Sequence, residues 1–171
     1  RVTVDAPGGS ISYLKGAPEV LIGRCQMSAV DRAVWEQRAE RHAQDGHRVL
    51  ALASGSGTAE DTLTLLGLAL FWDPPRAEVP DAVRRAQAAG IRVVMITGDH
   101  PATALAIAQQ IGIADPEVLT GADLAALEGA ALGRAIAEST VFARVQPEQK
   151  LQIVETLQGQ GRVVAMTGDG V

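Results

Sequence analysis

Apolar residues follow two different patterns along this chain, and the change falls at residues 73–76. Before that point, residues 29–44 have the spacing of a helix, and apolar runs predict strands at 48–54 and 62–72. The segment Asp-Pro-Pro-Arg at 73–76 then ends regular structure, because two prolines fix φ and remove two backbone donors. We interpret it as a boundary or hinge that follows a smaller α+β portion.

After this boundary, β-branched apolar runs alternate with amphipathic helical segments. Such alternation indicates an α/β fold, in which a parallel, Rossmann-like sheet is covered by helices on both faces. The expected strands are 91–96, 141–144 and 162–166, and the expected helices are 79–90, 101–112 and 147–161, with helical pieces at 121–138.

Composition and charge narrow the class of protein. The 171 residues carry a net charge of −5 and no basic stripe, which argues against nucleic-acid binding. Cys25 is the single cysteine, so neither an internal disulfide nor a cysteine-based metal site is expected, and a reducing cytoplasm is the default compartment. The longest apolar run, at 63–72, is shorter than the ~20 residues that cross a bilayer, so we expect a soluble stretch of chain.

The triplet Thr-Gly-Asp occurs twice, at 97–99 and at 167–169, each time directly after a strand-like run. In an open parallel sheet, ligands bind beyond the carboxyl ends of the strands, and both triplets are expected there. A hydroxyl and backbone N–H groups suit phosphate oxygens, and a carboxylate suits Mg²⁺. Thr-Gly-Asp is also a good turn sequence, so for either copy alone a purely structural role remains open.

Lys150 is the third candidate for phosphate chemistry. Pro147 predicts the start of a helix, and Lys150 would lie in its first turn. A solvent-facing lysine is the usual interpretation. The helix dipole disfavours a cation at this end, however, and a nearby phosphate or carboxylate would explain its presence.

Six short motifs follow one another along the chain. They are KGAPE at 15–19, GHRVLALA at 46–53, DPPR at 73–76, MITGDH at 95–100, ARVQPEQK at 143–150 and MTGDGV at 166–171. In this order they resemble the P-type cation-transporting ATPases, especially the bacterial type II pumps that are similar to calcium ATPases. The resemblance covers essentially the whole chain. It implies an ATP-hydrolysing cation translocase that works through an aspartyl-phosphate.

The resemblance also implies a domain organisation. Residues 1–72 correspond to the C-terminal part of a nucleotide-binding domain, 73–76 to the hinge, and 77–171 to part of a phosphorylation domain with a haloacid-dehalogenase-like fold. The chain would then be a cytoplasmic region of an integral membrane protein, with the membrane and actuator domains of the pump as its partners. The transported ion is set by membrane helices, so family likeness suggests calcium while magnesium, manganese and a monovalent cation stay open.

In the first part, the resemblance assigns Lys15 and Gly16 to the adenine pocket and Arg48 to the phosphates of ATP. The cofactors that it implies are ATP and Mg²⁺. These three assignments come from motif positions alone.

In the second part, the resemblance assigns Thr97 and Gly98 to the phosphoryl group and Asp99 to support of that loop. Lys150 would bond to the phosphoryl oxygen and to the phosphorylated aspartate, and Asp169 would be a ligand of the catalytic Mg²⁺. These roles agree with the chemistry that the residue types suggest, in which positioning and charge neutralisation supply most of the catalysis.

Two departures from the family pattern bear on activity. The nucleophile of the family lies in Asp-Lys-Thr-Gly-Thr, which this sequence does not contain, and Asp73 is followed by Pro-Pro instead. The family also continues the last motif with Asn-Asp, whereas this sequence ends at Val171. We therefore expect the chain to be inactive alone and to be a piece of a longer pump.

Two other functions stay open. One is an isolated module that binds nucleotide or Mg²⁺-phosphate without catalysis. The other is a haloacid-dehalogenase-type phosphatase, which would need an Asp-x-Asp near its first strand, and none is present.

The missing motif also raises an expectation about the sheet. In the family, the strand that carries the nucleophile is central and lies between the strands that end at Thr97 and Thr167. Without it, we expect strands 91–96 and 162–166 to pair directly or to borrow a strand, because unpaired buried backbone groups cost about 1–3 kcal/mol each. The donor would be residues 1–6 or a second copy, so self-association is also expected.

Overall fold

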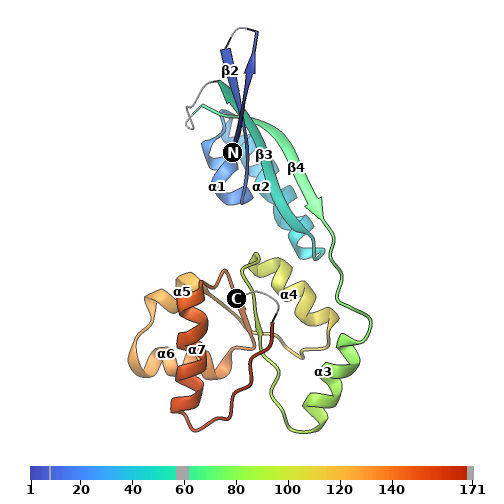
Figure 1. The fold of residues 1–171 in the computed structure, drawn as a ribbon, viewed down its shortest axis with the longest axis vertical. Helices are drawn as coiled ribbons and strands as arrows, with labels where there is room; N and C mark the ends of the chain where they lie inside the picture. The colour runs from blue at the N-terminus through green and yellow to red at the C-terminus, as the bar shows by residue number, and fades with distance from the viewer. Residues whose placement is uncertain (8, 57–61, 169–171) are drawn as a thin grey trace. The chain divides into compact units, whose positions relative to one another are not determined.

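A computed structural model describes residues 1–7, 9–56 and 62–168 of the chain. These residues form two compact units, Arg1–Pro74 and Pro75–Val171, which are best followed one at a time (Figure 1). The division falls inside the segment 73–76. No helix among the described residues is long and apolar enough to span a membrane.

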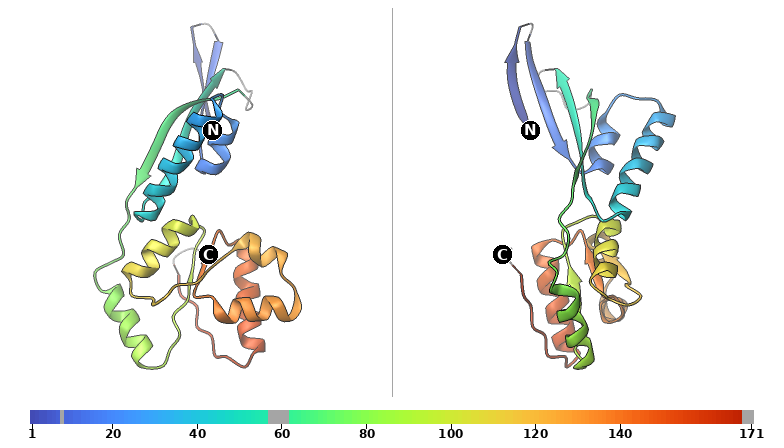
Figure 2. Two further views of the ribbon diagram at one scale, coloured as in Figure 1. Left: turned by 180° about the vertical axis from the view of Figure 1, so that it is seen from behind. Right: turned by 90° about the vertical axis from the view of Figure 1, so that its right-hand side faces the viewer.

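The Arg1–Pro74 unit is a four-stranded antiparallel sheet with helices on one side (Figure 2). The strands pair in the order in which they occur in the sequence. They are β1 (Val2–Ala6), β2 (Gly9–Gly16), β3 (Arg48–Ser56) and β4 (Thr64–Phe71), and the helical segments are α1 (Pro18–Leu21), the 3₁₀ turn η1 (Ile22–Arg24) and α2 (Ala29–Gln44).

The alternation of buried and exposed side chains along β3 shows which face of this sheet is covered. Ala51 and Ala53 are fully buried and pack in a cluster with Ile22 of η1, whereas Leu52 between them is 37% exposed. The opposite face of the sheet therefore carries the side chains at alternate positions and is left open by these helices.

The buried side of α2 is formed by its alanines and not by its valines. Val30 is 74% exposed and Val34 is 41% exposed, whereas Ala39 and Ala43 are buried. Small residues four apart let a helix approach a sheet closely, so alanine spacing outweighs the larger apolar side chains here.

The Pro75–Val171 unit is an α/β layer structure around a three-stranded parallel sheet in the order β5-β7-β6. Its central strand, β7, is buried throughout. The elements are α3 (Val79–Ala88), β5 (Met95–Ile96), α4 (Pro101–Gln110), β6 (Val118–Thr120), α5 (Gly121–Ala126), α6 (Gly129–Glu138), β7 (Val141–Ala143) and α7 (Pro147–Gly159).

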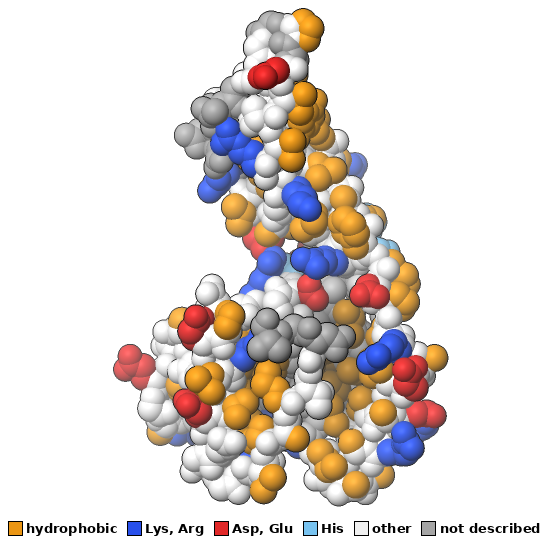
Figure 3. Space-filling view, viewed as in Figure 1, with side chains coloured by type: hydrophobic (Ala, Val, Ile, Leu, Met, Phe, Trp, Pro, Cys, Tyr) orange, Lys and Arg blue, Asp and Glu red, His pale blue; other side chains and the backbone are white. Residues whose placement is uncertain are grey.

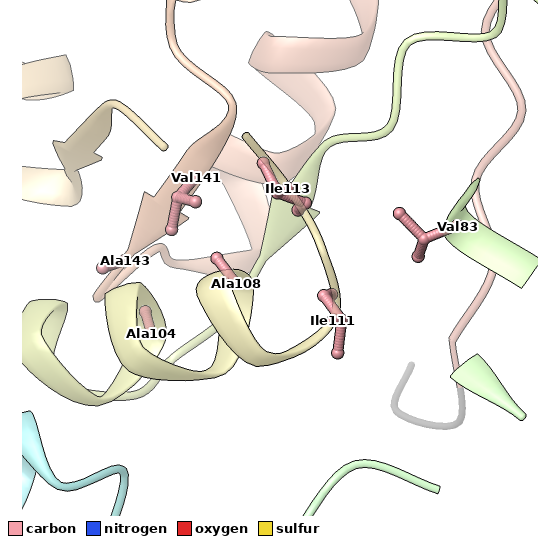
Figure 4. Packing of buried hydrophobic residues seen from close by; sticks show 7 residues of the cluster. All are labelled: Val83, Ala104, Ala108, Ile111, Ile113, Val141 and Ala143. Atoms are coloured by element: carbon pink, nitrogen blue, oxygen red, sulfur yellow. The ribbon is translucent and has the colours of Figure 1, made fainter. Parts of the chain in front are cut away.

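Helices cover both faces of this sheet. On one face Val141 and Ala143 pack with α4, which presents Ala104 and Ala108 to them (Figure 4). On the other face Phe142 packs against side chains from three further helices; its partners are Leu124 of α5, Ile136 of α6, and Ile153 and Leu157 of α7. The predicted parallel sheet with helices on both faces is therefore confirmed.

The expected closure of this sheet is wrong. The predicted strand 91–96 shortens to Met95–Ile96, and residues 162–168 form no strand. Val163 is fully exposed, so this segment does not pair with β5 in the way that we expected. Strand β1 is not borrowed either, because it pairs with β2 in its own unit.

Strand β5 explains why the expectation failed. The amides of Met95 and Thr97 donate to Thr140 and Phe142 at 2.9 and 2.8 Å, so both point toward β7. The amide of Ile96 between them points to the other edge of the sheet. A strand of two residues leaves few such groups without a ladder partner, and the two helical layers already bury the side chains of the central strand β7.

Candidate functional site

The first Thr-Gly-Asp triplet forms a tight loop directly after β5. The hydroxyl of Thr97 donates to the Asp99 carboxylate at 3.1 Å and accepts from the Asp99 amide, also at 3.1 Å. Gly98 between them is exposed, and a Cβ added there would meet no atom within 4 Å. The loop therefore presents an exposed glycine next to a hydroxyl and a carboxylate that these two hydrogen bonds hold together.

This loop is joined to the turn between β7 and α7. The amide of Val145 donates to the Thr97 carbonyl, and the amide of Arg144 donates to the Asp99 carbonyl, each at 3.2 Å. Both contacts lie at the carboxyl ends of adjacent parallel strands, where open α/β sheets bind ligands. Two predicted site segments, far apart in the sequence, are thus brought together.

Lys150 lies in the first turn of α7, as predicted. The helix begins after Gln146, and the side chains and amides of Gln146 and Gln149 form a reciprocal capping box. Lys150 follows at once and is partly buried. Its cation is therefore placed at the positive end of the helix dipole, at the same end of the sheet as the Thr97 loop.

Two other polar residues near this end of the sheet are helix caps. His100 caps α4, because its Nδ1 accepts from the Ala102 amide at 3.3 Å. Asp123 caps α5 with Thr120, whose hydroxyl donates to the Asp123 carboxylate at 2.6 Å. This hydrogen bond lowers the pKa of Asp123, because it favours the ionised carboxylate. Both residues therefore have local structural roles.

The second Thr-Gly-Asp triplet gives less structural evidence for a ligand site than the first. Thr167 and Gly168 are described but lie in no strand, and Asp169, the predicted Mg²⁺ ligand, is outside the described residues. In the part of the chain that the structure describes, no three His, Cys, Asp or Glu side chains gather around one point. Mg²⁺ usually takes one or two carboxylates with phosphate oxygens. Because the predicted ligand Asp169 is outside the described residues, those residues do not by themselves build such a site.

The open face of the Arg1–Pro74 sheet carries two of the three predicted nucleotide-binding residues, Lys15 and Arg48. Lys15 on β2 lies directly opposite Leu52 on β3, and Gly16 is opposite Ala51. Arg48 is four residues before Leu52 on the same strand, so Arg48 and Lys15 share a face. They are about 13 Å apart along the strand direction, at ~3.3 Å per residue.

Exposed apolar side chains lie next to Lys15 and continue along the sheet on the side away from Arg48. Ile11, Tyr13 and Leu52 are 37, 45 and 37% exposed and alternate with the buried positions of β2 and β3. Figure 3 shows hydrophobic side chains along this unit with Lys and Arg among them. An exposed apolar surface beside Lys15 suits an aromatic base, and the Arg48 guanidinium on the same face suits phosphate oxygens.

Sequence reasoning missed two features around the Thr97 loop. Strand β6 is only three residues long, too short for its periodicity to be read. Arg144 has a φ of 54°, a left-handed conformation that is uncommon for a residue other than glycine. Nothing in the sequence signals this turn, although the Arg144 amide contacts the predicted site.

Comparisons with known proteins cover almost the whole chain. A family model described as haloacid dehalogenase-like hydrolase matches residues 13–171. Cation-transporting ATPase pma1 of Synechocystis is 46% identical, over 98% of this chain and 21% of that protein. Probable cation-transporting ATPase F of Mycobacterium tuberculosis is 45% identical, over 92% and 20%. Calcium-transporting ATPase 1 of Lactococcus lactis is 39% identical, over 98% and 21%. The chain spans about a fifth of these relatives.

Proposed function

Because this chain belongs to the haloacid dehalogenase-like hydrolases, we propose that it is the ATP-binding and phosphorylation region of a P-type cation pump. The pump would hydrolyse ATP through an aspartyl-phosphate and carry this region on its cytoplasmic side. One observation carries the proposal: the Thr97 loop meets the turn that leads to Lys150, at the carboxyl end of a parallel sheet. Similarity to cation-transporting ATPases over nearly the whole chain supports it.

In this proposal the Thr97 loop and Lys150 hold the transferred phosphoryl group. The Gly98 amide donates a hydrogen bond to its oxygens. The Thr97 hydroxyl has a single proton, which it donates to the Asp99 carboxylate in this structure and would turn to a phosphoryl oxygen when the group binds, while the Asp99 amide still donates to Thr97 and keeps the loop closed. The Lys150 ammonium neutralises the charge that builds up on the phosphoryl oxygens. Such fixed donors and charges account for most of the catalysis in phosphoryl transfer. Mg²⁺, when bound through Asp169, would supply further charge neutralisation.

The proposal gives the open face of the first sheet to ATP. Lys15 and Gly16 would contact the adenine end and Arg48 the phosphates, with residues 1–72 as part of the nucleotide-binding domain. Residues 73–76 would be the hinge and 77–171 part of the phosphorylation domain. The nucleophile would come from an Asp-Lys-Thr-Gly-Thr motif outside this sequence, so the chain alone is proposed to bind ligands and to catalyse nothing.

Nucleotide binding by the chain tests the first half of this proposal. Replacing Arg48 by alanine is expected to weaken ATP binding about tenfold, because a charge-assisted hydrogen bond to phosphate contributes about 1.5 kcal/mol or more. Lys15→Ala is expected to weaken it as well. Titration of the purified chain with ATP, followed by amide chemical shifts, measures both effects.

Arg41→Ala is the matched control for this titration. Arg41 is exposed in the last turn of α2, on the helical side of the same sheet, and its loss changes the net charge equally. We expect this variant to bind ATP as the unchanged chain does. If neither Arg48→Ala nor Lys15→Ala differs from Arg41→Ala, the nucleotide face is wrongly assigned.

A further inference from the structure

Gly121, the first residue of α5, lies against the turn that leads to the candidate phosphate site. It is buried, and a Cβ built on it would lie 2.3 Å from the carbonyl oxygen of Arg144 and 2.7 Å from Oε1 of Gln149. Contacts under 3.0 Å force an atom to move, and a backbone oxygen moves only with its chain. Glycine alone fits this position without displacing the turn between β7 and α7.

A hydrogen bond fixes the same contact from the side of α7. Nε2 of Gln149 donates to the Gly121 carbonyl at 2.6 Å, while its Oε1 accepts from the Gln146 amide at 3.0 Å. One side chain thus holds the start of α5 and the start of α7 together. Lys150 is the next residue, and its amide donates to Gln146 at 3.1 Å.

The turn that Gly121 touches also holds the Thr97 loop. The Arg144 amide donates to the Asp99 carbonyl, whereas the Arg144 carbonyl faces Gly121. Arg144 reaches both neighbours in its left-handed conformation. A shift of the Arg144 peptide would therefore move the loop and the first turn of α7 together.

We propose that Gly121 is a positioning residue, whose lack of a side chain sets the relative placement of Lys150 and the Thr97 loop. Gln149 acts with it as the second half of the contact. The inference rests on the proposed function, because the geometry that it sets matters only if these groups hold phosphate. Displacements of about 1 Å in such a site can lower its effectiveness by about two orders of magnitude.

The test uses inorganic phosphate and the two lysines of the sequence, Lys15 and Lys150. Reductive ¹³C-methylation of the chain labels both, so the Lys150 methyl signal reports phosphate at the proposed site and Lys15 reports the other unit. Sodium chloride at equal ionic strength controls for screening. We expect phosphate to shift the Lys150 signal, and Gly121→Ala to weaken this response about tenfold or more. Gly159 lies in the last turn of α7, and a Cβ added there would meet no atom within 4 Å. Gly159→Ala is therefore expected to respond as the unchanged chain does.

Three outcomes decide the matter. A response of Gly121→Ala equal to that of the unchanged chain overturns the positioning role and leaves the phosphate site standing. Absence of any Lys150 response in the unchanged chain overturns the phosphate site, and the inference with it. If Gly121→Ala does not fold, Gln149→Met decides, since it keeps the length of the side chain and removes both hydrogen bonds. A weakened response with dispersed amide signals supports the role, and an unchanged one overturns it.

Discussion

Replacing Lys150 by alanine is expected to slow phosphoenzyme formation in the complete pump by about 10²–10³-fold, the cost of removing one preorganised charge from such a site. The stability of the fold should not decrease. Lys150 lies in the first turn of α7, where the helix dipole disfavours a cation, so its loss is expected to leave the free energy of unfolding unchanged or raise it by about 0.3–1 kcal/mol. Labelling with radioactive ATP, quenched in acid at short times, measures the rate.

Lys15→Ala is the control, because it removes the other lysine of the sequence from the proposed nucleotide face. We expect it to raise the ATP concentration needed for half-maximal labelling and to keep the rate at saturating ATP. Lys150→Ala should show the reverse pattern. Labelling of Lys150→Ala at the rate of the unchanged pump would remove Lys150 from the phosphate site.

The second large effect concerns stability. Phe142 is fully buried in the central strand β7, between side chains of α5, α6 and α7. Phe142→Ala is expected to lower the free energy of unfolding of the Pro75–Val171 unit by about 3–5 kcal/mol, through lost apolar burial and the cavity left behind. Urea denaturation of the chain, followed by far-ultraviolet circular dichroism, measures the loss.

Tryptophan fluorescence separates this effect from a general loss of structure. Trp35 and Trp72, the two tryptophans of the sequence, both lie in the Arg1–Pro74 unit. The clusters around Phe142 contain only residues of the second unit, so the fluorescence transition should keep its midpoint. Leu151→Ala on α7 is the control: Leu151 is 59% exposed, and its loss should cost less than about 0.5 kcal/mol. An equal loss in both variants would contradict the described core.

Much of the fold could be predicted from the sequence, because periodicity and proline placement are local signals. The helices at 29–44 and 147–161 and the strand at 141–144 lie close to where their patterns predict them. The prediction of a strand at 162–166 was wrong for a physical reason. An apolar run favours an extended chain, but a strand also needs a hydrogen-bonded neighbour. Strand β6 was not predicted, because three residues are too few to show a period of apolar positions.

The candidate site also has features that the sequence predicts and one that it does not. The placement of Thr97 after β5 and of Lys150 after Pro147 follows from strand ends and helix starts, which sequence patterns reveal. The contact of Gly121 with Arg144 joins residues 23 positions apart through a backbone oxygen. No residue type encodes such a contact, so only the folded chain shows it.

Acid-quenched labelling with radioactive ATP tests the central claim most directly, when the complete protein and the isolated chain are compared. We predict an acid-stable phosphoprotein in the complete protein, with the label on the aspartate of an Asp-Lys-Thr-Gly-Thr motif, and no label on the isolated chain, since nucleophilic catalysis needs the nucleophile. Label on the isolated chain at Asp73, or none in the complete protein, would contradict the assignment of this chain to an aspartyl-phosphate pump.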